Sequence, residues 1–392
     1  MKRKKPMNRR QFLINNRKNI AISLVAVLVV GIVGSIILLT KAAGTVVSSE
    51  IESGTKSANI QTVSDATASG GSAVKFKTGS VATGCTPVSG IPAGFPNNCN
   101  SGYKAAPGYP GSLTAFTGTI QSNTTYSFKD FPSGASIGTT GTPVTNVTFY
   151  GCRFHDINLD GALIVMFGDN ITLDYSSLEP EVAAPPIPYN KGYQYGLEAN
   201  GSYNAYVNKF TVTHSEIWGF GNAIDASGST QAKPHTFRGN YIHDPRNDGG
   251  IDHTDGIGEL NGAASDYVVI DNNTIIGDGN TNGIAYQYGP YRNFTVTNNY
   301  FSGYGYMINL GGYGGPTNIT FTDNVWGTNI QQAYGPWYSW AGTGNLWRRN
   351  KIHFVNQIKL QGDDPNSYVI KATDEGKFWT PSGISTTDYT GN

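Results

Sequence analysis

A nine-residue segment recurs eight times between residues 146 and 352, and it constrains the fold of this chain more than any other feature. The copies begin at residues 146, 170, 209, 234, 267, 293, 318 and 344. Most copies therefore start 24 to 26 residues apart, with gaps of 39 and 33 residues at two places. Self-similarity at such a period is typical of a solenoid, in which each repeat is one turn of a coil.

The apolar pattern within the segment predicts strands. Positions 2 and 4 are mostly apolar, as at Val147 and Phe149, and position 9 is always apolar. This alternation is typical of a strand with one buried face. A second apolar strand follows in most repeats, around Leu197, Ile224, Ile257, Ile284 and Ile308.

One turn of such a coil cannot bury its own apolar face, whereas stacked turns enclose a continuous core. Position 7 is asparagine in the last five copies, and stacked Asn amides hydrogen-bond to the copies above and below. These residues are Asn240, Asn273, Asn299, Asn324 and Asn350. We therefore expect an all-β parallel solenoid of about 8–10 coils, in which the asparagines have a structural role.

Composition agrees with this fold class. The 50 Gly and 19 Pro residues do not suit a helical bundle. Charged residues make up 14% and aromatic residues 12% of the chain, a balance that argues against a long disordered chain.

The N-terminal region predicts a membrane anchor. Residues 20–39 form an uncharged apolar run long enough to cross a bilayer, and eight basic residues precede it. We expect residues 1–19 to be cytoplasmic, residues 20–40 to be a transmembrane signal anchor, and the remainder to be exported to the cell surface. A cleaved signal peptide is the alternative, although residues 40–43 match its cleavage site poorly.

The distribution of charge argues against a nucleic-acid partner. Nine of the 27 basic residues lie within residues 1–41, which contain no acidic residue. The rest of the chain therefore has 18 basic and 27 acidic residues, whereas phosphate binding needs a clustered basic face.

Three cysteines in an exported protein suggest one disulfide and one spare thiol. Cys85 and Cys99 are close in sequence within a loop-like segment, so we expect them to pair, with Cys152 buried in a strand. Residues 41–82 form a separate linker or stub, in which residues 50–76 resemble the first strands of carbohydrate-binding modules of secreted glycosidases, without the rest of such a module. The alternative is a Ser/Thr/Gly spacer that ends in a short hairpin.

The repeat pattern resembles right-handed parallel β-helix proteins of the pectate lyase-like superfamily over residues 110–360. The resemblance is specific for the fold and weak for the reaction, because lyases, hydrolases, epimerases and adhesins share this architecture. We expect residues 83–145 to be an N-terminal cap and first coils, residues 146–360 the β-helix, and residues 361–392 a C-terminal cap or tail.

The two long repeats predict a functional groove. The coil that starts at 170 has about 14 extra residues and the coil that starts at 234 about 8, both placed just after position 9. Glu198 and Asp225 directly follow buried residues in neighbouring coils, and Asp255 lies in the sequence HTDGI. This sequence resembles an H-x-D-G-I motif of exported bacterial β-helix proteins associated with polysaccharide breakdown.

We therefore expect Glu198, Asp225 and Asp255 to gather on one wall, with His253 beside them. Such carboxylates would serve as acid and base in a glycoside hydrolase. In a polysaccharide lyase, Asp225 and Asp255 would hold Ca²⁺, and Arg246 or His253 would remove a ring proton. His243 is less favoured, because His155 and His353 occupy the same coil position and suggest a turn feature.

Aromatic residues supply candidate sugar contacts, because sugar rings stack on aromatic faces. The candidates are Trp218, Tyr286, Tyr288, Trp337 and Tyr338. Taken together, the sequence predicts an exported, membrane-anchored β-helix that engages polysaccharide as a lyase or hydrolase. The alternative is a non-catalytic adhesin or carbohydrate-binding protein.

Overall fold

The structure is a computed structural model, and it divides the chain into two units, residues 1–76 and 77–392. In the first unit, β1 (Ile60–Ser64) and β2 (Ser72–Phe76) form an antiparallel hairpin. The expected anchor at residues 20–40 lies outside the described residues, and no helix within the described ranges is long and apolar enough to cross a membrane. The described residues are 60–64, 72–76, 84–139, 141–156, 161–181, 194–199, 208–246, 253–259, 264–287, 289–310, 315–330, 335–337, 342–359 and 369–390.

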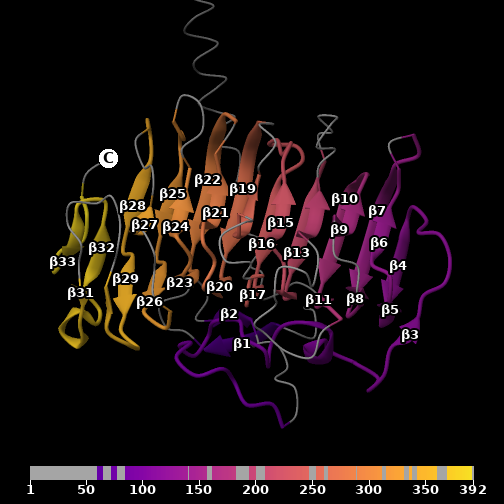
Figure 1. Cartoon of the computed structure of the whole chain (residues 1–392), viewed down its shortest axis with the longest axis horizontal. Helices are drawn as coiled ribbons and strands as arrows, with labels where there is room; N and C mark the ends of the chain where they lie inside the picture. Colours follow the sequence, from indigo (N-terminus) through magenta and orange to yellow (C-terminus); the bar gives the residue numbers. More distant parts are fainter. Residues whose placement is uncertain are drawn as a thin grey trace, which may run out of the picture. The chain divides into compact units, whose positions relative to one another are not determined.

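The second unit is a parallel β-solenoid with three sheets, which we call sheets I, II and III (Figure 1). The chain visits the three sheets in turn, so the strands inside the solenoid pair in parallel with strands one coil earlier and one coil later. The prediction of a parallel β-helix is therefore confirmed.

Each nine-residue segment contributes strands to two sheets. Sheet I contains positions 2 to 5, and sheet II contains positions 8 and 9. Sheet I has nine strands: β4 (Thr124–Ser127), β7 (Val144–Tyr150), β10 (Gly168–Asp174), β13 (Phe210–Thr213), β16 (His235–Arg238), β19 (Ser265–Asp271), β22 (Tyr291–Thr297), β25 (Thr320–Thr322) and β28 (Leu346–Arg348).

Sheet II has twelve strands: β3 (Thr114–Ala115), β5 (Lys129–Phe131), β8 (Arg153–Asp156), β11 (Ser177–Pro180), β14 (Glu216–Trp218), β17 (Tyr241–His243), β20 (Thr274–Gly277), β23 (Tyr300–Gly303), β26 (Val325–Gly327), β29 (Lys351–His353), β32 (Phe378–Thr380) and β33 (Gly383–Ser385). Sheet III has eight: β6 (Ala135–Ile137), β9 (Ala162–Met166), β12 (Tyr195–Ala199), β15 (Asn222–Ala226), β18 (Asp255–Glu259), β21 (Asn282–Tyr286), β24 (Tyr306–Asn309) and β27 (Gly335–Trp337).

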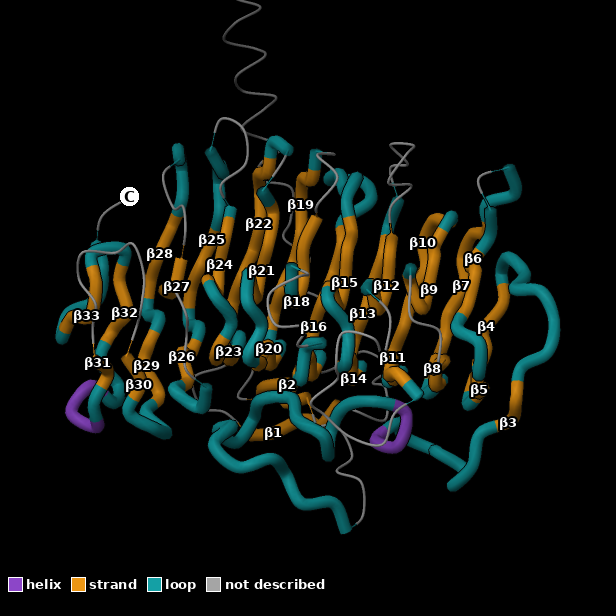
Figure 2. The backbone as a smooth tube through the Cα atoms, viewed as in Figure 1, coloured by secondary structure: helices purple, strands orange, loops and turns teal. Residues whose placement is uncertain are grey.

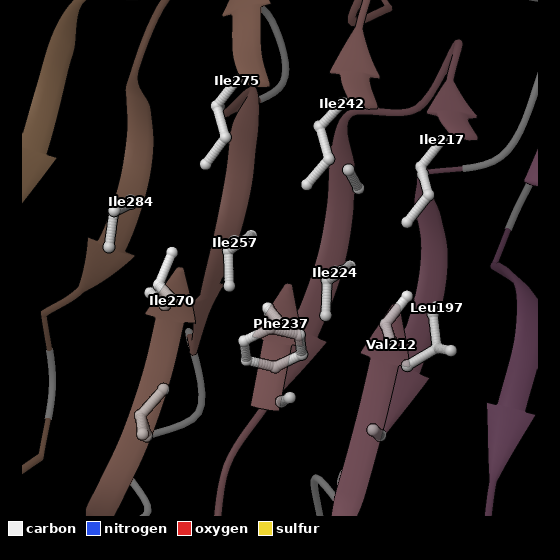
Figure 3. Packing of buried hydrophobic residues seen from close by; sticks show 14 of the residues in the cluster. Leu197, Val212, Ile217, Ile224, Phe237, Ile242, Ile257, Ile270, Ile275 and Ile284 are labelled. Atoms are coloured by element: carbon white, nitrogen blue, oxygen red, sulfur yellow. The ribbon is translucent and has the colours of Figure 1, made fainter. Parts of the chain in front are cut away.

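The core is the interior of the solenoid, where apolar side chains from all three sheets converge (Figure 3). In one coil these are Val212 from sheet I, Ile217 from sheet II and Ile224 from sheet III, each almost completely buried. The same three positions are filled again one strand further along, by Phe237, Ile242 and Ile257.

The corner between sheets I and II contains a buried ladder of side chains at position 7. Asn240 Nδ2 donates to Asn273 Oδ1 at 2.9 Å, and Asn273, Asn299 and Asn324 each donate in the same way to the next asparagine. Each amide oxygen also accepts the backbone N–H of the preceding ladder residue. The predicted Asn ladder is confirmed.

Both ends of the solenoid are covered by aromatic residues. At the N-terminal end, the Phe116 ring lies 5.1 Å from Tyr126 and 4.8 Å from Phe131. At the C-terminal end, β32 and β33 form a hairpin at the edge of sheet II, and Trp379 packs 5.6 Å from Trp326. Next to it, β30 (Ile358–Lys359) pairs with β31 (Val369–Ile370), and the 3-10 helix η4 (Ala372–Asp374) follows.

Residues 84–109 do not cover an end of the solenoid but run along its outside, and we call them the strap (Figure 2). Tyr300 Oη donates to Gly90 O at 2.8 Å, Gly102 N donates to His214 O at 2.8 Å, and Tyr150 Oη donates to Pro107 O at 2.9 Å. The strap therefore passes from β23 back to β7 before the first coil begins. It contains the 3-10 helix η3 (Tyr103–Ala105) and the Cys85–Cys99 disulfide, with Cα atoms 5.5 Å apart, and Cys152 is a buried free thiol.

The first prediction concerns the ladder. Asn299→Ala removes the acceptor of the Asn273 amide groups and the donor to Ile270 O, all of which are buried. We expect the free energy of unfolding to fall by about 3 kcal/mol, because buried polar groups lose their partners. Thr295→Ala in the same coil is the control, and we expect a change of about 0.5 kcal/mol. Denaturant titration checks both, and equal losses would show that the ladder does not stabilise the coil.

The second prediction concerns the strap. Gly102 has φ +79°, and a Cβ there would lie 2.6 Å from Ser177 Oγ, whereas Gly94 has φ +98° with nothing within 4 Å. Both Gly→Ala variants lose stability because alanine is strained at a positive φ. In Gly102→Ala the new methyl group also crowds Ser177, which lowers the free energy of unfolding by about a further 1–3 kcal/mol. We expect limited proteolysis to cut the strap faster in Gly102→Ala than in Gly94→Ala. Equal cutting rates would contradict the close docking of Gly102.

Candidate functional site

Two long connections leave sheet II for sheet III on either side of a very short one. Residues 181–194 join β11 to β12, and residues 244–254 join β17 to β18. Between them, β14 and β15 are joined by residues 219–221 alone. The extra length of the coil that starts at 170 is shared with a second corner, since residues 200–209 join β12 to β13.

The ends of the two long connections pack against this short turn. Gly219 N donates to Asp244 O at 2.9 Å, and Arg246 N donates to Phe220 O at 2.9 Å. A Cβ at Gly221 would lie 3.0 Å from Gln194 O and 3.7 Å from Arg246 Nη2. Residues at the ends of both long connections therefore meet at one corner of the solenoid. Residues 182–193 and 247–252 lie outside the described residues, so the groove expected between the two connections stays a prediction.

Glu198 and Asp225 are neighbours in sheet III. The register of β12 and β15 pairs Leu197 with Ile224 and Glu198 with Asp225. Leu197 and Ile224 point into the core (Figure 3), so the two carboxylates point to the outer face by strand alternation. Glu198 is half-buried and Asp225 is 1% exposed.

Asp255 does not join them, which corrects the expected three-carboxylate wall. The register pairs Asp255 with Asn222, and Asp225 with Gly258. Asp255 lies two residues before the core residue Ile257 and therefore has the same orientation as Ile257, on the inner side of the sheet. An odd separation of three residues between Asp255 and Gly258 places them on opposite faces.

The contacts of Asp255 are structural. Its Oδ1 accepts from Asn282 N at 2.9 Å, from Asn282 Nδ2 at 2.8 Å and from Thr281 Oγ1 at 3.0 Å. Burial raises the pKa of the Asp255 carboxyl, although the hydrogen bonds from Asn282 and Thr281 act in the opposite direction. Asp225 and Asp255 therefore do not form the expected Ca²⁺ pair, and the described residues contain no group of three metal-ligating side chains.

Arg246 and His253 stand at the two ends of the second long connection. Arg246 is 3% exposed, with its guanidinium beside Gly221. His253 is exposed, and its charge acts on Asp255. The structure thus brings both residues to the corner, because a Cβ at Gly221 would also lie 3.5 Å from His253 O.

Among the expected aromatic contacts, Tyr286 is a core residue. Its ring is completely buried, 5.3 Å from Tyr291 and 4.8 Å from Phe294, so it offers no face to a sugar. Tyr288, Tyr338 and the side chain of Trp337 lie outside the described residues. Trp218 is half-buried at the end of β14, next to the short turn.

Trp218 belongs to a row of side chains on the outer face of sheet II. The register aligns position 10 of four consecutive strands, one residue from each of β8, β11, β14 and β17. Trp218 Nε1 donates to Glu179 Oε2 at 3.4 Å, and its ring stacks 6.3 Å from His243. We call His155, Glu179, Trp218 and His243 the Trp218 strip.

The two histidines of the strip each lie between two carboxylates. His243 Nδ1 is 2.6 Å from Asp244 Oδ2, and its Nε2 is 3.4 Å from Glu216 Oε1. His155 Nε2 is 3.1 Å from Asp130 Oδ1, and its Nδ1 is 3.6 Å from Glu181 Oε2. Asp244 and Glu181 are the first residues of the two long connections, so each histidine holds the start of one connection.

Protonated His243 is favoured by these contacts. Burial alone would lower the pKa of His243, but the hydrogen bond to Asp244 and the nearby carboxylate of Glu216 outweigh it and raise that pKa above the ordinary 6.5. Sequence reasoning gave His243 little weight because of its recurrence with His155 and His353. The same recurrence could have identified the row of side chains that contains His243, since residues at one coil position line up across the sheet.

The strap borders the strip. Burial, followed by the charge of Glu179, raises the pKa of Tyr103 to about 12, and Arg153 forms an ion pair with Glu179. A Cβ at Gly102 would lie 3.0 Å from Glu216 Oε2. The strip thus lies between the strap and the corner with the long connections, and it combines an aromatic ring with a carboxylate and two imidazoles.

Compared with protein-family models, curated proteins and solved structures, the chain shows no match.

The third prediction follows from His243. Its raised pKa means that protonation stabilises the folded state below pH 6.5, and that this stabilisation is lost as the pH rises through the folded-state pKa. We expect His243→Gln to lower the free energy of unfolding by about 1 kcal/mol at pH 6 and by clearly less at pH 9. Denaturant titration at both pH values measures this, and an equal loss at both would contradict the charged contacts.

Proposed function

We propose that this chain is a polysaccharide-active β-helix protein that hydrolyses a glycosidic bond at the corner between sheets II and III. The observation that carries this proposal is the register pairing of Glu198 with Asp225 on the outer face of sheet III, beside the turn at residues 219–221. Loops on a rigid scaffold concentrate function, and two long connections meet here.

The carboxylate pair suits glycoside hydrolysis. One carboxyl protonates the leaving oxygen, and the other acts on water or on the sugar. Adjacent strands are about 4.8 Å apart, so their side chains can reach the separations of about 5–9 Å that such pairs use. Hydrolysis by two carboxyl groups needs no metal. The lyase hypothesis instead requires Asp225 and Asp255 to bind Ca²⁺ together, and these two residues lie on opposite faces of sheet III.

Trp218 supports binding of a sugar close to this pair. Its ring is held by the indole N–H bond to Glu179 and is half-buried, so part of it is accessible to the C–H groups of a sugar ring. The basic and apolar N-terminal segment and the Cys85–Cys99 disulfide support an exported, membrane-anchored protein, since disulfides persist in oxidising compartments.

A non-catalytic carbohydrate-binding protein or adhesin is the second candidate. The Trp218 strip supports the binding-protein candidate. The strip consists of sheet II residues, so it could contact a sugar even if Glu198 and Asp225 of sheet III catalyse no reaction.

The fourth prediction separates these candidates. A panel of polysaccharides is incubated with the full chain, and products are assayed for new reducing ends and for unsaturated, UV-absorbing ends. We expect reducing ends without ultraviolet absorbance, and we expect Glu198→Gln and Asp225→Asn each to lower turnover by about 10²–10⁴-fold, as loss of a general acid or base does.

Asp255→Asn is the matched control, because an amide keeps the Oδ1 acceptor and Asp255 faces inward. We expect it to retain turnover. Full activity in Glu198→Gln and Asp225→Asn would rule out the pair. Binding without turnover in the wild-type protein would favour the adhesin, and unsaturated products would favour a lyase.

A further inference from the structure

His235 is a polar residue in an apolar row of the core. It occupies position 2 of its segment, where the strands on either side place Phe210 and Val268. Its side chain is completely buried, and the centre of its ring lies 6.3 Å from the rings of both Phe210 and Phe237. An apolar side chain would fit this position without the cost of burying polar atoms, so packing alone does not explain the histidine.

The contacts of His235 define which of its ring nitrogens carries the proton. Burial lowers the pKa of His235 to about 4, so the ring is uncharged near neutral pH and has a single N–H group. Nδ1 is buried without a hydrogen-bond partner, whereas Nε2 lies 2.8 Å from Asn208 Oδ1. Because a carbonyl oxygen only accepts, Nε2 carries the proton and donates to Asn208.

Asn208 extends this contact to sheet III. Its side chain is buried, and its Nδ2 donates to Ala199 O at 3.5 Å. Ala199 is the last residue of β12, and Asn208 lies two residues before the start of β13. The hydrogen bond therefore joins the two ends of the connection between these strands, of which residues 200–207 lie outside the described part of the chain.

These contacts tie together the two coils that contain the carboxylate pair. Glu198 directly precedes Ala199 in β12, and Asp225 lies in β15, which leads to His235 in β16. The register pairs Glu198 with Asp225 and Ala199 with Ala226. Each carboxylate is therefore one residue from the end of its strand, where fraying displaces a side chain most easily.

We infer that His235 and Asn208 are positioning residues, which hold the end of β12 so that Glu198 stays opposite Asp225. The inference rests on the proposed hydrolysis and adds to it two residues that touch no substrate. A pair of carboxyl groups needs a defined separation for this reaction, and a displacement of about 1 Å can cost about 10²-fold in rate. Loss of the contacts therefore acts on kcat more than on KM.

Two substitutions of His235 separate positioning from packing. His235→Phe keeps an aromatic ring in the apolar row and removes the donor to Asn208. His235→Gln keeps a donor, because its amide nitrogen takes the place of Nε2. If His235 served packing alone, Phe would be the better replacement, whereas positioning predicts that Gln is better.

Steady-state kinetics of the full chain on a polysaccharide that it cleaves provides the first readout. We expect His235→Phe to lower kcat about tenfold with little change in KM, and His235→Gln to restore most of kcat. Asn208→Ala should match His235→Phe, and the double variant should lose no more than either one, because the two residues act in one chain of contacts.

Thr236→Ala is the matched control, because Thr236 follows His235 in β16 and faces outward. We expect this variant to have the kcat of the wild type. Wild-type kcat in His235→Phe, or losses that add in the double variant, would overturn the inference.

A second readout does not depend on turnover. In a Glu198→Cys/Asp225→Cys background, the rate of cross-linking by a short bifunctional thiol reagent reports how closely the two positions are held. We expect His235→Phe to slow this reaction about twofold or more, and His235→Gln to leave it unchanged. Equal rates in the two variants, both with a cooperative melting transition, would contradict the positioning role.

Together the two readouts distinguish failure of this inference from failure of the proposed function. Slower cross-linking in His235→Phe, in a chain that cleaves no polysaccharide, would remove the hydrolase and keep the positioning role. Turnover that depends on Glu198 but is equal in His235→Phe and the wild type would keep the hydrolase and remove the positioning role.

Discussion

Parallel stacking of identical coil positions is the constraint on which the rest of this structure depends. The clearest expression of it is the buried ladder at position 7, which does not end where the asparagines end. Ser215 N donates to Asn240 Oδ1, Ser176 N donates to Ser215 Oγ, and Cys152 N donates to Ser176 Oγ. Smaller polar side chains thus continue the same backbone contacts through the earlier coils, where a serine hydroxyl replaces the amide oxygen as acceptor. Unpaired buried N–H groups would be costly in every coil, so the ladder fixes the register of the whole solenoid.

The register of the strands determines which side chains of the repeated coils lie together in the candidate site. Once coil positions are aligned, residues far apart in sequence become neighbours, as with Glu198 and Asp225 or with Trp218 and His243. The two histidines of the strip show the same effect at the level of loops, because each one holds the first residue of a long connection. The site is therefore supported by rigid strands on one side and by loop ends anchored to those strands on the other.

Much of the fold could be predicted from the sequence, because the period, the apolar positions and the Asn ladder all reflect one repeated environment. The candidate site was harder to predict from the sequence than the fold, for three physical reasons. Strand alternation places residues an odd number apart on opposite faces, so the spacing of Asp255 from Gly258 separates it from Asp225. Burial cannot be read from aromatic character alone, and Tyr286 packs in the core. Recurrence of histidine at one position was interpreted as a turn feature, although it aligns imidazoles beside carboxylates that are distant in sequence.

Thiol cross-linking of sheet III tests most directly whether aligned coils create the proposed site. A double variant Glu198→Cys/Asp225→Cys and a double variant Asp225→Cys/Asp255→Cys are treated with a short bifunctional thiol reagent, and the linked peptides are identified by mass spectrometry. The register described here predicts an efficient cross-link in the first variant, because the residues are adjacent on the outer face, and little in the second, because its residues face opposite sides. The reverse result, with Asp225 linked to position 255 and not to position 198, would contradict the alignment of coils and remove the basis of the site.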